Sequence, residues 1–268
     1  MESRKDSLPA HRARLSRVLR AAKEVVSVDV TTGTLGIDRR AAAKLLSRWK
    51  QQGWLRRIGH GLYVPVPLDL AGSEQVIEDP WVLLPTLFSD CYVGGWTAAH
   101  HWEFTEQLFN ETLVFTTRRV TEKRVVAQGA AFVLHNVKPK RLFGLKTLWR
   151  GSVKVSISDP ARTLVDMIAA PDVGGGIDHV ADSLGAYLAT KAADRDLLIR
   201  YAKQFDNGAV FKRLGYLAET RLHDNKLAAE CRSRLTQGYA RLDPTLPPKK
   251  LATAWRLWLP SARKETAS

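Results

Sequence analysis

The chain has 268 residues, of which 45% are hydrophobic and 25% charged, and its formal net charge is +14. This length suggests two domains and allows a sizeable core. The two cysteines are too few for a disulfide framework and suit a reducing compartment. No apolar run approaches the about 18 residues of a membrane span, and residues 1–15 are too charged for a signal peptide. We therefore expect a cytoplasmic protein.

The positive charge is concentrated near the N-terminus. Residues 1–70 contain 14 lysines and arginines but 6 aspartates and glutamates, so this segment accounts for +8 of the net +14. The asymmetry indicates an anionic polymer as partner. An anionic membrane is the alternative. Against it, the basic residues lie opposite an apolar stripe of only ordinary core size.

Two helices are expected first in the chain. After Pro9, residues 10–24 place apolar side chains at helical spacing, with Leu15, Val18 and Leu19 on one face. Residues 28–35 are expected to form a short second helix that leads to a turn at Gly36. Its threonines and Gly33 are poor helix formers, so packing must stabilise it.

The most informative stretch begins at Asp38. Asp38 is a good N-cap, and an apolar stripe follows at i, i+3, i+4 and i+7, formed by Ala42, Leu45, Leu46 and Trp49. The opposite face is polar and basic, and Gly53 can adopt the left-handed conformation that ends a helix. Residues 54–58 and 62–64 then form a predicted hairpin around Gly59-His60-Gly61.

A basic helix followed directly by a basic hairpin is typical of a winged helix-turn-helix. Such a helix fits the major groove of DNA, and the wing contacts the backbone beside it. We expect Arg40 and Lys44 to reach base edges, with Gln51 at the far end of the helix. The full set of expected DNA contacts is Arg39, Arg40, Lys44, Ser47, Arg48, Gln51, Arg56, Arg57 and His60.

The remaining chain mixes strands with helices. Helices are expected at residues 81–88 and 96–102, the latter after Tyr92-Val93 and two glycines. Strands are expected at 112–117, 124–127, 131–135 and 153–157. Asp159-Pro160 starts a helix, and further helices are expected at 177–191, 195–205, 208–223 and 226–235, before a last strand at 254–259.

The sequence thus predicts an α+β protein. A winged helix-turn-helix domain (residues 1–68) and a linker (69–76) precede a larger α+β domain (77–268). That domain should contain short, mostly antiparallel strands packed with helices, and its C-terminal half should be mainly helical.

No catalytic constellation is evident in the second domain. His100 and His101 are consecutive, so they point about 100° apart on a helix and lack metal-ligand spacing. Gly174-Gly175-Gly176 before a helix could hold a phosphate, but no Lys-Ser/Thr follows it. We expect no metal and no cofactor.

Several blocks of the second domain resemble the AbiEi family, the antitoxins of type IV (abortive infection) toxin–antitoxin systems. The resemblance begins with the wing sequence at residues 57–63. It continues with YVGGWTAA at 92–99, SDPARTLVD at 158–166, GGI at 175–177 and KRLGYLAE at 212–219. In order, these blocks span most of the chain, from about residue 28 to 220, and the similarity fades toward the C-terminus.

The resemblance implies a nucleoid-associated transcriptional autorepressor that is not an enzyme. Family members bind repeats in double-stranded DNA upstream of their own operon, and their C-terminal domain counters a nucleotidyltransferase toxin, without a stable complex being required. Arg162, Asp166, Lys212 and Arg213 lie in matching blocks and form a candidate antitoxin surface, although Arg162 and Asp166 could instead anchor their helix. The alternatives are a simple winged-helix repressor with a ligand- or protein-sensing C-terminal domain, and an enzyme that modifies the toxin by phosphoryl transfer.

Overall fold

The structure, a computed structural model, describes residues 10–22, 25–59, 61–66, 79–88, 90–120 and 122–261. The chain divides into two compact units. Unit 1 comprises residues 1–91, 124–132 and 148–155, and unit 2 comprises residues 92–123, 133–147 and 156–268. The expected linker at residues 69–76 lies outside the described residues, so the domain boundaries given above stay a prediction.

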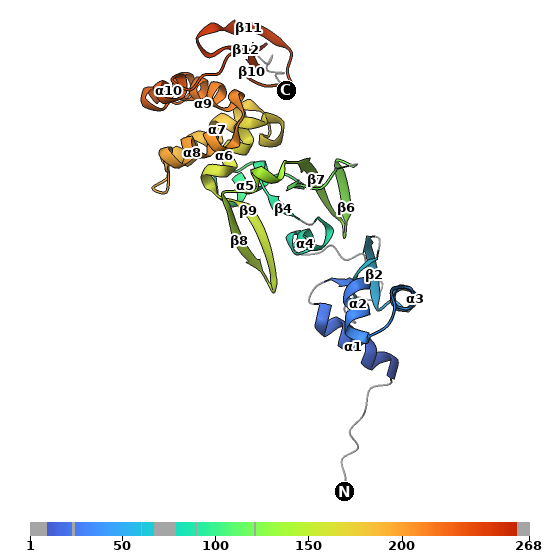
Figure 1. The fold of residues 1–268 in the computed structure, drawn as a ribbon. Coiled ribbons are helices and arrows are strands. Elements are labelled where there is room, and N and C mark those ends of the chain that lie inside the picture. Colours follow the sequence, from blue (N-terminus) through green and yellow to red (C-terminus); the bar gives the residue numbers. More distant parts are fainter. Residues whose placement is uncertain are drawn as a thin grey trace. The chain divides into compact units, whose positions relative to one another are not determined.

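The N-terminal part of unit 1 is a helical triplet with a small sheet (Figure 1). The three helices and the hairpin follow the predicted order, whereas the two-residue strand β1 was not predicted; the sheet order is β1-β3-β2 with antiparallel pairing. The elements are α1 (Ala10–Ala22), β1 (Val26–Ser27), α2 (Val28–Leu35), α3 (Arg39–Gln51), β2 (Leu55–Gly59) and β3 (Leu62–Pro65). This arrangement confirms the winged helix-turn-helix predicted from the sequence.

Helix α2 forms despite its poor helix formers because its ends are well capped. The Ser27 hydroxyl accepts a hydrogen bond from Val30 N at 3.1 Å, and the Thr31 hydroxyl donates to the Ser27 carbonyl at 2.8 Å. Gly36 ends the helix at φ +66°, a conformation that glycine adopts without a Cβ penalty. Thr31 is fully buried, so packing adds to the caps.

Helix α3 forms as its sequence predicts. Asp38 Oδ1 accepts from Ala41 N at 2.9 Å, and Gly53 follows the helix at φ +76°. Ala42, Leu46 and Trp49 are buried, with exposed fractions of at most 1%. Leu46 and Trp49 join Val18, Val26, Leu55 and Tyr63 in one apolar core, which fixes the opposite face of α3 toward solvent.

The central sheet has six strands in the order β6-β7-β5-β4-β9-β8, and β4 pairs with β9 in parallel. Four of these strands match predicted ones, whereas β8 was not predicted because its sequence, LKTLWR, lacks strict alternation. The strands are β4 (Cys91–Val93), β5 (Glu111–Thr116), β6 (Arg124–Ala127), β7 (Ala130–Asn136), β8 (Leu145–Arg150) and β9 (Val153–Ser158).

Two shorter features flank β4. The helix expected at residues 81–88 is a 3₁₀ turn η2 (Pro80–Leu83) that continues into the single-turn helix α4 (Leu84–Leu87). After β4, helix α5 (Gly95–His101) begins directly at a glycine pair. A Cβ on Gly94 would lie 2.5 Å from the Phe115 ring, and Gly95 has φ +53°, so both positions require glycine.

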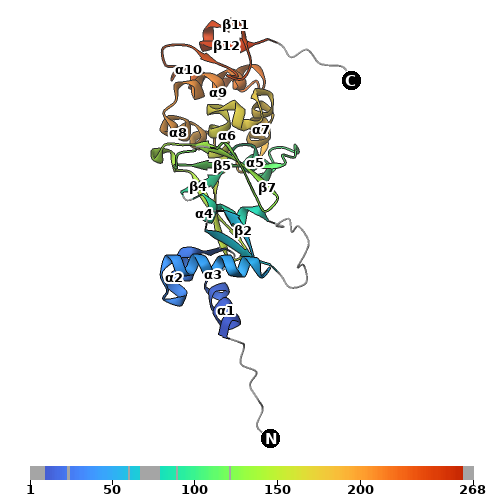
Figure 2. The same ribbon diagram turned by 90° about the vertical axis from the view of Figure 1, so that its right-hand side faces the viewer.

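The helices of unit 2 gather on one side of its strands (Figure 2). They enclose the larger core, which contains Leu164, Leu184, Leu198 and Leu214, each with an exposed fraction of 0%. The longer helices are α6 (Pro160–Ala169), α7 (Ile177–Ala189), α8 (Arg195–Phe205), α9 (Gly208–Thr220) and α10 (Asn225–Arg232), and the 3₁₀ turns are η3 (Pro139–Arg141) and η4 (Pro171–Gly174).

A second small sheet closes the described chain. Strand β12 (Leu257–Pro260) pairs in parallel with β10 (Ala240–Arg241) and antiparallel with β11 (Pro248–Ala252). The sequence predicted one strand at residues 254–259. The strand begins later because η5 (Thr253–Trp255) is a 3₁₀ turn and Arg256 adopts φ +51°. Within the described residues, no helix is long and apolar enough to span a membrane.

Candidate nucleic-acid interface

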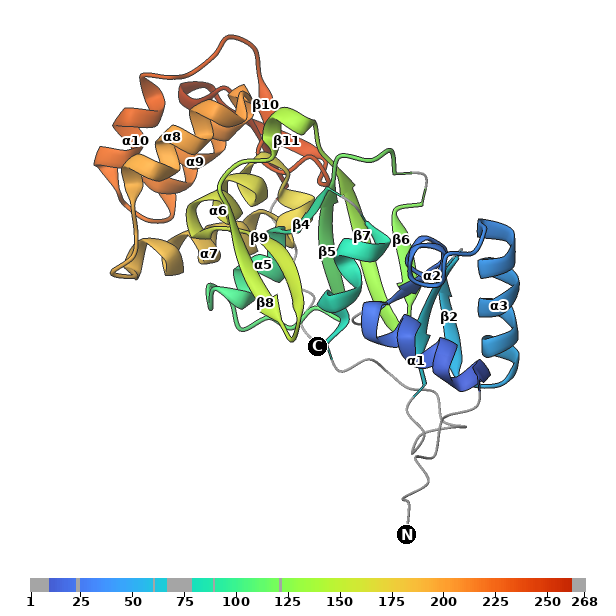
Figure 3. The ribbon, with the colours of Figure 1, turned by 60° about the horizontal axis from the view of Figure 1, so that its bottom comes forward.

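Figure 3 shows helix α3 along its length. One face of this helix carries a continuous exposed polar and basic row. Arg40, Lys44, Ser47 and Gln51 recur at i, i+4, i+7 and i+11, which places them on one side of a helix. All four are exposed, as is Arg48 beside them. The row is exposed because Leu46 and Trp49 hold the other side of the helix in the core.

The cationic side chains in this row are not neutralised within the described part of the chain. Arg40, Lys44 and Arg48 have no side-chain hydrogen bond, ion pair or ring contact with another described residue. An exposed, uncompensated arginine or lysine keeps its charge and its hydrogen-bond donors available to an anion. The row can therefore contact both phosphate oxygens and the acceptor groups of base edges.

Arg39 differs from its neighbours because it is ion-paired. Its Nη1 contacts Oδ1 of Asp29 on α2, and both side chains are more than 70% exposed. Exposed pairs of this kind contribute about 0–1 kcal/mol. Arg39 is thus held against α2 by a weak interaction that a phosphate could displace.

The hairpin supplies further positive charge. Arg56 and Arg57 lie on β2, opposite Val64 and Tyr63 of β3; Arg56 is half-buried and Arg57 exposed. Both make contacts within the protein. Gly61 has φ +72°, as a tight turn requires. His60, another expected DNA contact, lies outside the described residues.

The structure corrects the interpretation of Arg162 and Asp166 as part of a surface. Their exposed fractions are 0% and 2%, so neither presents charge to a partner. Arg162 Nη2 donates to Asp166 Oδ1 at 2.9 Å and to the Tyr92 hydroxyl at 2.9 Å, and its Nη1 donates to the carbonyls of Arg141 and Phe143. The alternative that this pair anchors helix α6 is therefore confirmed.

The ionisation of this cluster follows from its burial. Burial lowers the pKa of Arg162, but the Asp166 carboxylate and the Tyr92 hydroxyl raise it more, so the guanidinium stays charged. Burial raises the pKa of Asp166 against the opposing effect of Arg162. Burial also raises the pKa of Tyr92 well above its ordinary value, so the phenol stays protonated. The cluster has the properties of a structural ion pair.

Lys212 and Arg213 are corrected in the same way. Their exposed fractions are 3% and 4%. Lys212 Nζ donates to the Gly238 carbonyl at 2.9 Å, while Arg213 Nη1 donates to the carbonyls of Ile168 and Ala169 at the end of α6. Burial lowers the pKa of Arg213 to about 10 and also lowers the pKa of Lys212. These cations satisfy backbone carbonyls and do not form a partner surface.

The Gly174–Gly176 turn does not leave the N-terminus of α7 open to a phosphate, because a side chain of the protein already binds there. Gly175 and Gly176 have φ of +79° and +96°. Asp243 Oδ2 accepts from Ile177 N at 3.1 Å, at the N-terminus of α7. A carboxylate already occupies the place where a bound phosphate would accept hydrogen bonds. Among the described residues, no group of three or more His, Cys, Asp or Glu side chains could hold a metal.

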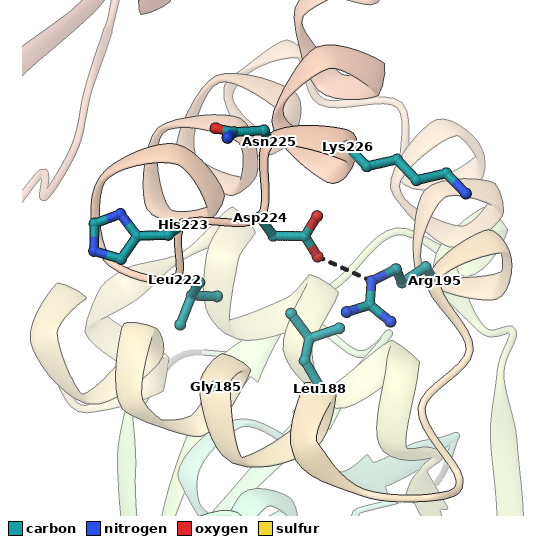
Figure 4. Close-up of a pocket in the computed structure, with 8 residues that line it drawn as sticks. All are labelled: Gly185, Leu188, Arg195, Leu222, His223, Asp224, Asn225 and Lys226. Carbon is teal, nitrogen blue, oxygen red and sulfur yellow. Dashed lines mark hydrogen bonds and ion pairs between the residues drawn. The ribbon is translucent and has the colours of Figure 1, made fainter.

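Unit 2 also has a pocket of about 580 Å³ that the sequence did not indicate (Figure 4). Its most prominent contact joins Arg195 Nε to Asp224 Oδ2 at 2.9 Å. Asp224 Oδ1 also accepts from Leu227 N at 3.0 Å, so it caps α10. The residues that line the pocket are Gly185, Leu188, Arg195, Leu222, His223, Asp224, Asn225 and Lys226. Arg195 and Asp224 thus serve the local helix packing.

The winged helix-turn-helix and the exposed basic face of α3 are features typical of a DNA-binding domain. Residues 27–66 match the family model described as "Transcriptional regulator, AbiEi antitoxin". The match covers 40 of the 268 residues, so it shows a similarity of this segment to the AbiEi antitoxin family. No curated protein sequence matches the chain.

One solved structure supports the fold over almost the whole chain. The crystal structure of the RV2827C protein from Mycobacterium tuberculosis is similar with a TM-score of 0.58. The similarity covers 94% of this chain and 92% of that chain, at 16% sequence identity. At this identity the similarity establishes a shared fold.

Proposed function

We propose that this protein is a DNA-binding transcriptional autorepressor and the antitoxin of a type IV toxin–antitoxin system. It binds operator repeats upstream of its own operon and counters a nucleotidyltransferase toxin. The observation that carries the proposal is the exposed row of uncompensated cations on α3, within the segment that matches the AbiEi antitoxin family.

In this proposal α3 enters the major groove with its N-terminal half nearest the bases. Arg40 and Lys44 read base edges, because arginine and lysine match the acceptor pair of guanine. Ser47 and Gln51 extend the same face toward the C-terminal end of the helix. The other basic residues contact phosphates and so fix the position of the protein along the DNA. They are Arg39, Arg48, Arg56, Arg57 and His60.

The residues after the expected linker neutralise the toxin in this proposal. The surface responsible is not formed by Arg162, Asp166, Lys212 or Arg213, because these side chains are buried. Their substitution should reduce neutralisation only as far as it unfolds the protein. Residues 1–68 are assigned to DNA binding and residues 77–268 to neutralisation of the toxin. This assignment can be tested separately from the individual DNA contacts.

We further propose that neutralisation proceeds by binding, without catalysis. Incubation of the protein with the toxin and labelled ATP tests this point. The proposal expects no label on the toxin, whereas transfer of label would replace it with an enzymatic antitoxin.

A paired experiment in cells tests the whole proposal. Expression of the gene downstream should arrest growth, and co-expression of this chain should restore it. A reporter fused to the upstream DNA should be repressed by the wild type and released by the double variant Arg40→Ala, Lys44→Ala, which should still restore growth. Repression without growth rescue would instead indicate a simple repressor with another role for its C-terminal domain.

A further inference from the structure

One face of the small C-terminal sheet, which β10, β11 and β12 form, packs against the core of unit 2. Ala240 and Leu242, which flank Arg241 along the chain, pack against the large core of unit 2, as do Leu257 and Leu259 on β12. Because side chains alternate along a strand, their neighbours must point the other way. The sheet therefore has a second, outer face. Figure 1 shows this sheet beside α9 and α10.

The outer face is aromatic and basic. Trp258 on the central strand lies opposite Arg241 on one side and Leu251 on the other, so these three share a face. Trp258 is 40% exposed. Tyr239 lies directly before β10, beside this face, and it is 62% exposed. We call Tyr239, Arg241, Leu251 and Trp258 the outer face.

The charges around the outer face are of one sign. Lys249, at the irregularity in β11, is exposed, and so is Lys250, although Lys250 lies opposite Leu259 and therefore not on the outer face itself. Asp243 is the single acidic residue between residues 239 and 261, and it is 3% exposed and bound to Ile177 N. The sheet and the residue before it thus carry two exposed aromatic rings and several cations, and residues 239–261 contribute no exposed carboxylate.

We propose that the outer face binds single-stranded nucleic acid. Unpaired bases stack on Trp258 and Tyr239, and Arg241 with Lys249 contacts the phosphates. Aromatic side chains on an open sheet stack successive bases of a single strand in this way.

The single-stranded form is favoured over other anionic partners by the aromatic rings. A duplex keeps its base faces stacked within the helix, so Trp258 and Tyr239 could not stack on them. An acidic protein segment would satisfy the cations but offers no planar partner for both rings. Trp258 on the central strand of a basic sheet offers a planar face on which an unpaired base can stack.

The test is an anisotropy titration of labelled 12-nucleotide poly-U RNA and poly-dT DNA with the full-length protein. Trp258→Ala and Tyr239→Ala are compared with the wild type and with Trp149→Ala. Trp149 is a matched control, because it is 61% exposed and lies 5.0 Å from the Lys154 ammonium in unit 1. Every protein in the comparison, the wild-type reference included, also carries Arg40→Ala and Lys44→Ala, so that binding by α3 does not mask a change at the outer face.

We expect Trp258→Ala and Tyr239→Ala each to weaken binding about tenfold. Trp149→Ala should have no effect, and Trp258→Phe should restore most of the loss because phenylalanine still stacks. Circular dichroism confirms that each variant is folded. Three results would each overturn the proposal. The first is equal affinity of Trp258→Ala and Trp149→Ala, and the second is absence of binding by the wild-type reference at low salt. The third is a Trp258→Phe variant that binds as weakly as Trp258→Ala. A poly-glutamate peptide is also tested as a competitor of the labelled nucleic acid. If binding of that peptide depends on Trp258 as strongly as nucleic-acid binding does, the proposal is overturned in favour of an acidic protein partner.

Discussion

Arg162 and Asp166 form a fully buried ion pair one helical turn apart, with Nη2 of the arginine 2.9 Å from Oδ1 of the aspartate. The same guanidinium donates to the Arg141 and Phe143 carbonyls, so it ties α6 to the chain segment before β8. A charge with this many protein partners and no solvent contact acts on the fold and not on a partner.

Removal of either member of this pair should therefore destabilise the protein strongly. We expect Arg162→Met to lower the free energy of unfolding by about 3–5 kcal/mol, because it leaves a buried carboxylate without its counter-ion. Urea denaturation followed by circular dichroism measures the loss. The double variant Arg162→Met, Asp166→Leu should recover part of it, since no unpaired charge then remains.

The surface pair between Arg221 and Asp178 provides the control. Its atoms are 3.0 Å apart, but the side chains are about half exposed or more. Arg221→Met should cost less than about 1 kcal/mol. Equal losses for Arg162→Met and Arg221→Met would refute the structural role assigned to the buried pair.

Gly215 on α9 should tolerate no side chain. A Cβ at this position would lie 2.1 Å from the Trp255 ring and 2.8 Å from the Cys231 Cβ. We expect Gly215→Ala to destabilise the protein by about 1–3 kcal/mol through overpacking, measured as a fall in the urea midpoint. Gly33→Ala on α2, where nothing lies within 4 Å, should instead raise stability by about 0.5–1 kcal/mol. A neutral Gly215→Ala would show that α9 and η5 are less closely packed than described.

His135 on β7 should make stability depend on pH. Burial lowers the pKa of His135 below its ordinary value, and the neighbouring Arg141 and Lys123 add to this effect. The folded state therefore favours the neutral ring. The neutral His135 ring contributes fully to the free energy of unfolding above the unfolded pKa of about 6.5. This contribution is lost as the pH falls below that value.

The variant His135→Phe isolates this effect, because phenylalanine preserves the ring contact with Phe115 at 5.0 Å between centroids. Denaturation at several pH values between about 5 and 8 should show a smaller loss of stability toward acid for His135→Phe than for the wild type. Parallel curves for the two proteins would mean that His135 does not titrate differently on folding.

The contacts proposed for α3 can be separated by their dependence on sequence. Arg40→Ala should weaken operator binding by about 1–3 kcal/mol and relax specificity, because it removes a base contact. Arg48→Ala should weaken operator and random DNA alike and reduce the salt slope by about 1, as expected of a phosphate contact. Arg200→Ala serves as control, because the Arg200 side chain on α8 is 63% exposed. Equal weakening of specific and random DNA by Arg40→Ala would contradict the role assigned to Arg40.

The winged helix-turn-helix was predictable because its signals are local. Asp38, the stripe from Ala42 to Trp49 and Gly53 each act within one helix, and the structure places all of them as expected. Helix α8 likewise begins after Asp194 and ends at Phe205, the bounds that its periodicity predicts.

The errors arose where distant contacts decide the structure. Strand β8 has no strict alternation, and β10 has two residues, so pairing partners far along the chain define both. The burial of Lys212 depends on the carbonyl of Gly238, and that of Arg213 on the end of α6. A charged residue in a sequence is expected at the surface, and only tertiary hydrogen bonds reveal the exception.

The central claim is that α3 recognises the DNA upstream of the gene for this protein. The most direct measurement titrates that DNA and a scrambled duplex with the wild type and with Arg40→Ala, Lys44→Ala, at about 0.05 and 0.2 M salt. We predict that the wild type prefers the upstream DNA by about 10³-fold or more, with affinity falling as salt rises, and that the double variant loses this preference. Equal and weak binding of both duplexes by the wild type would contradict the account and leave the second domain to carry the function.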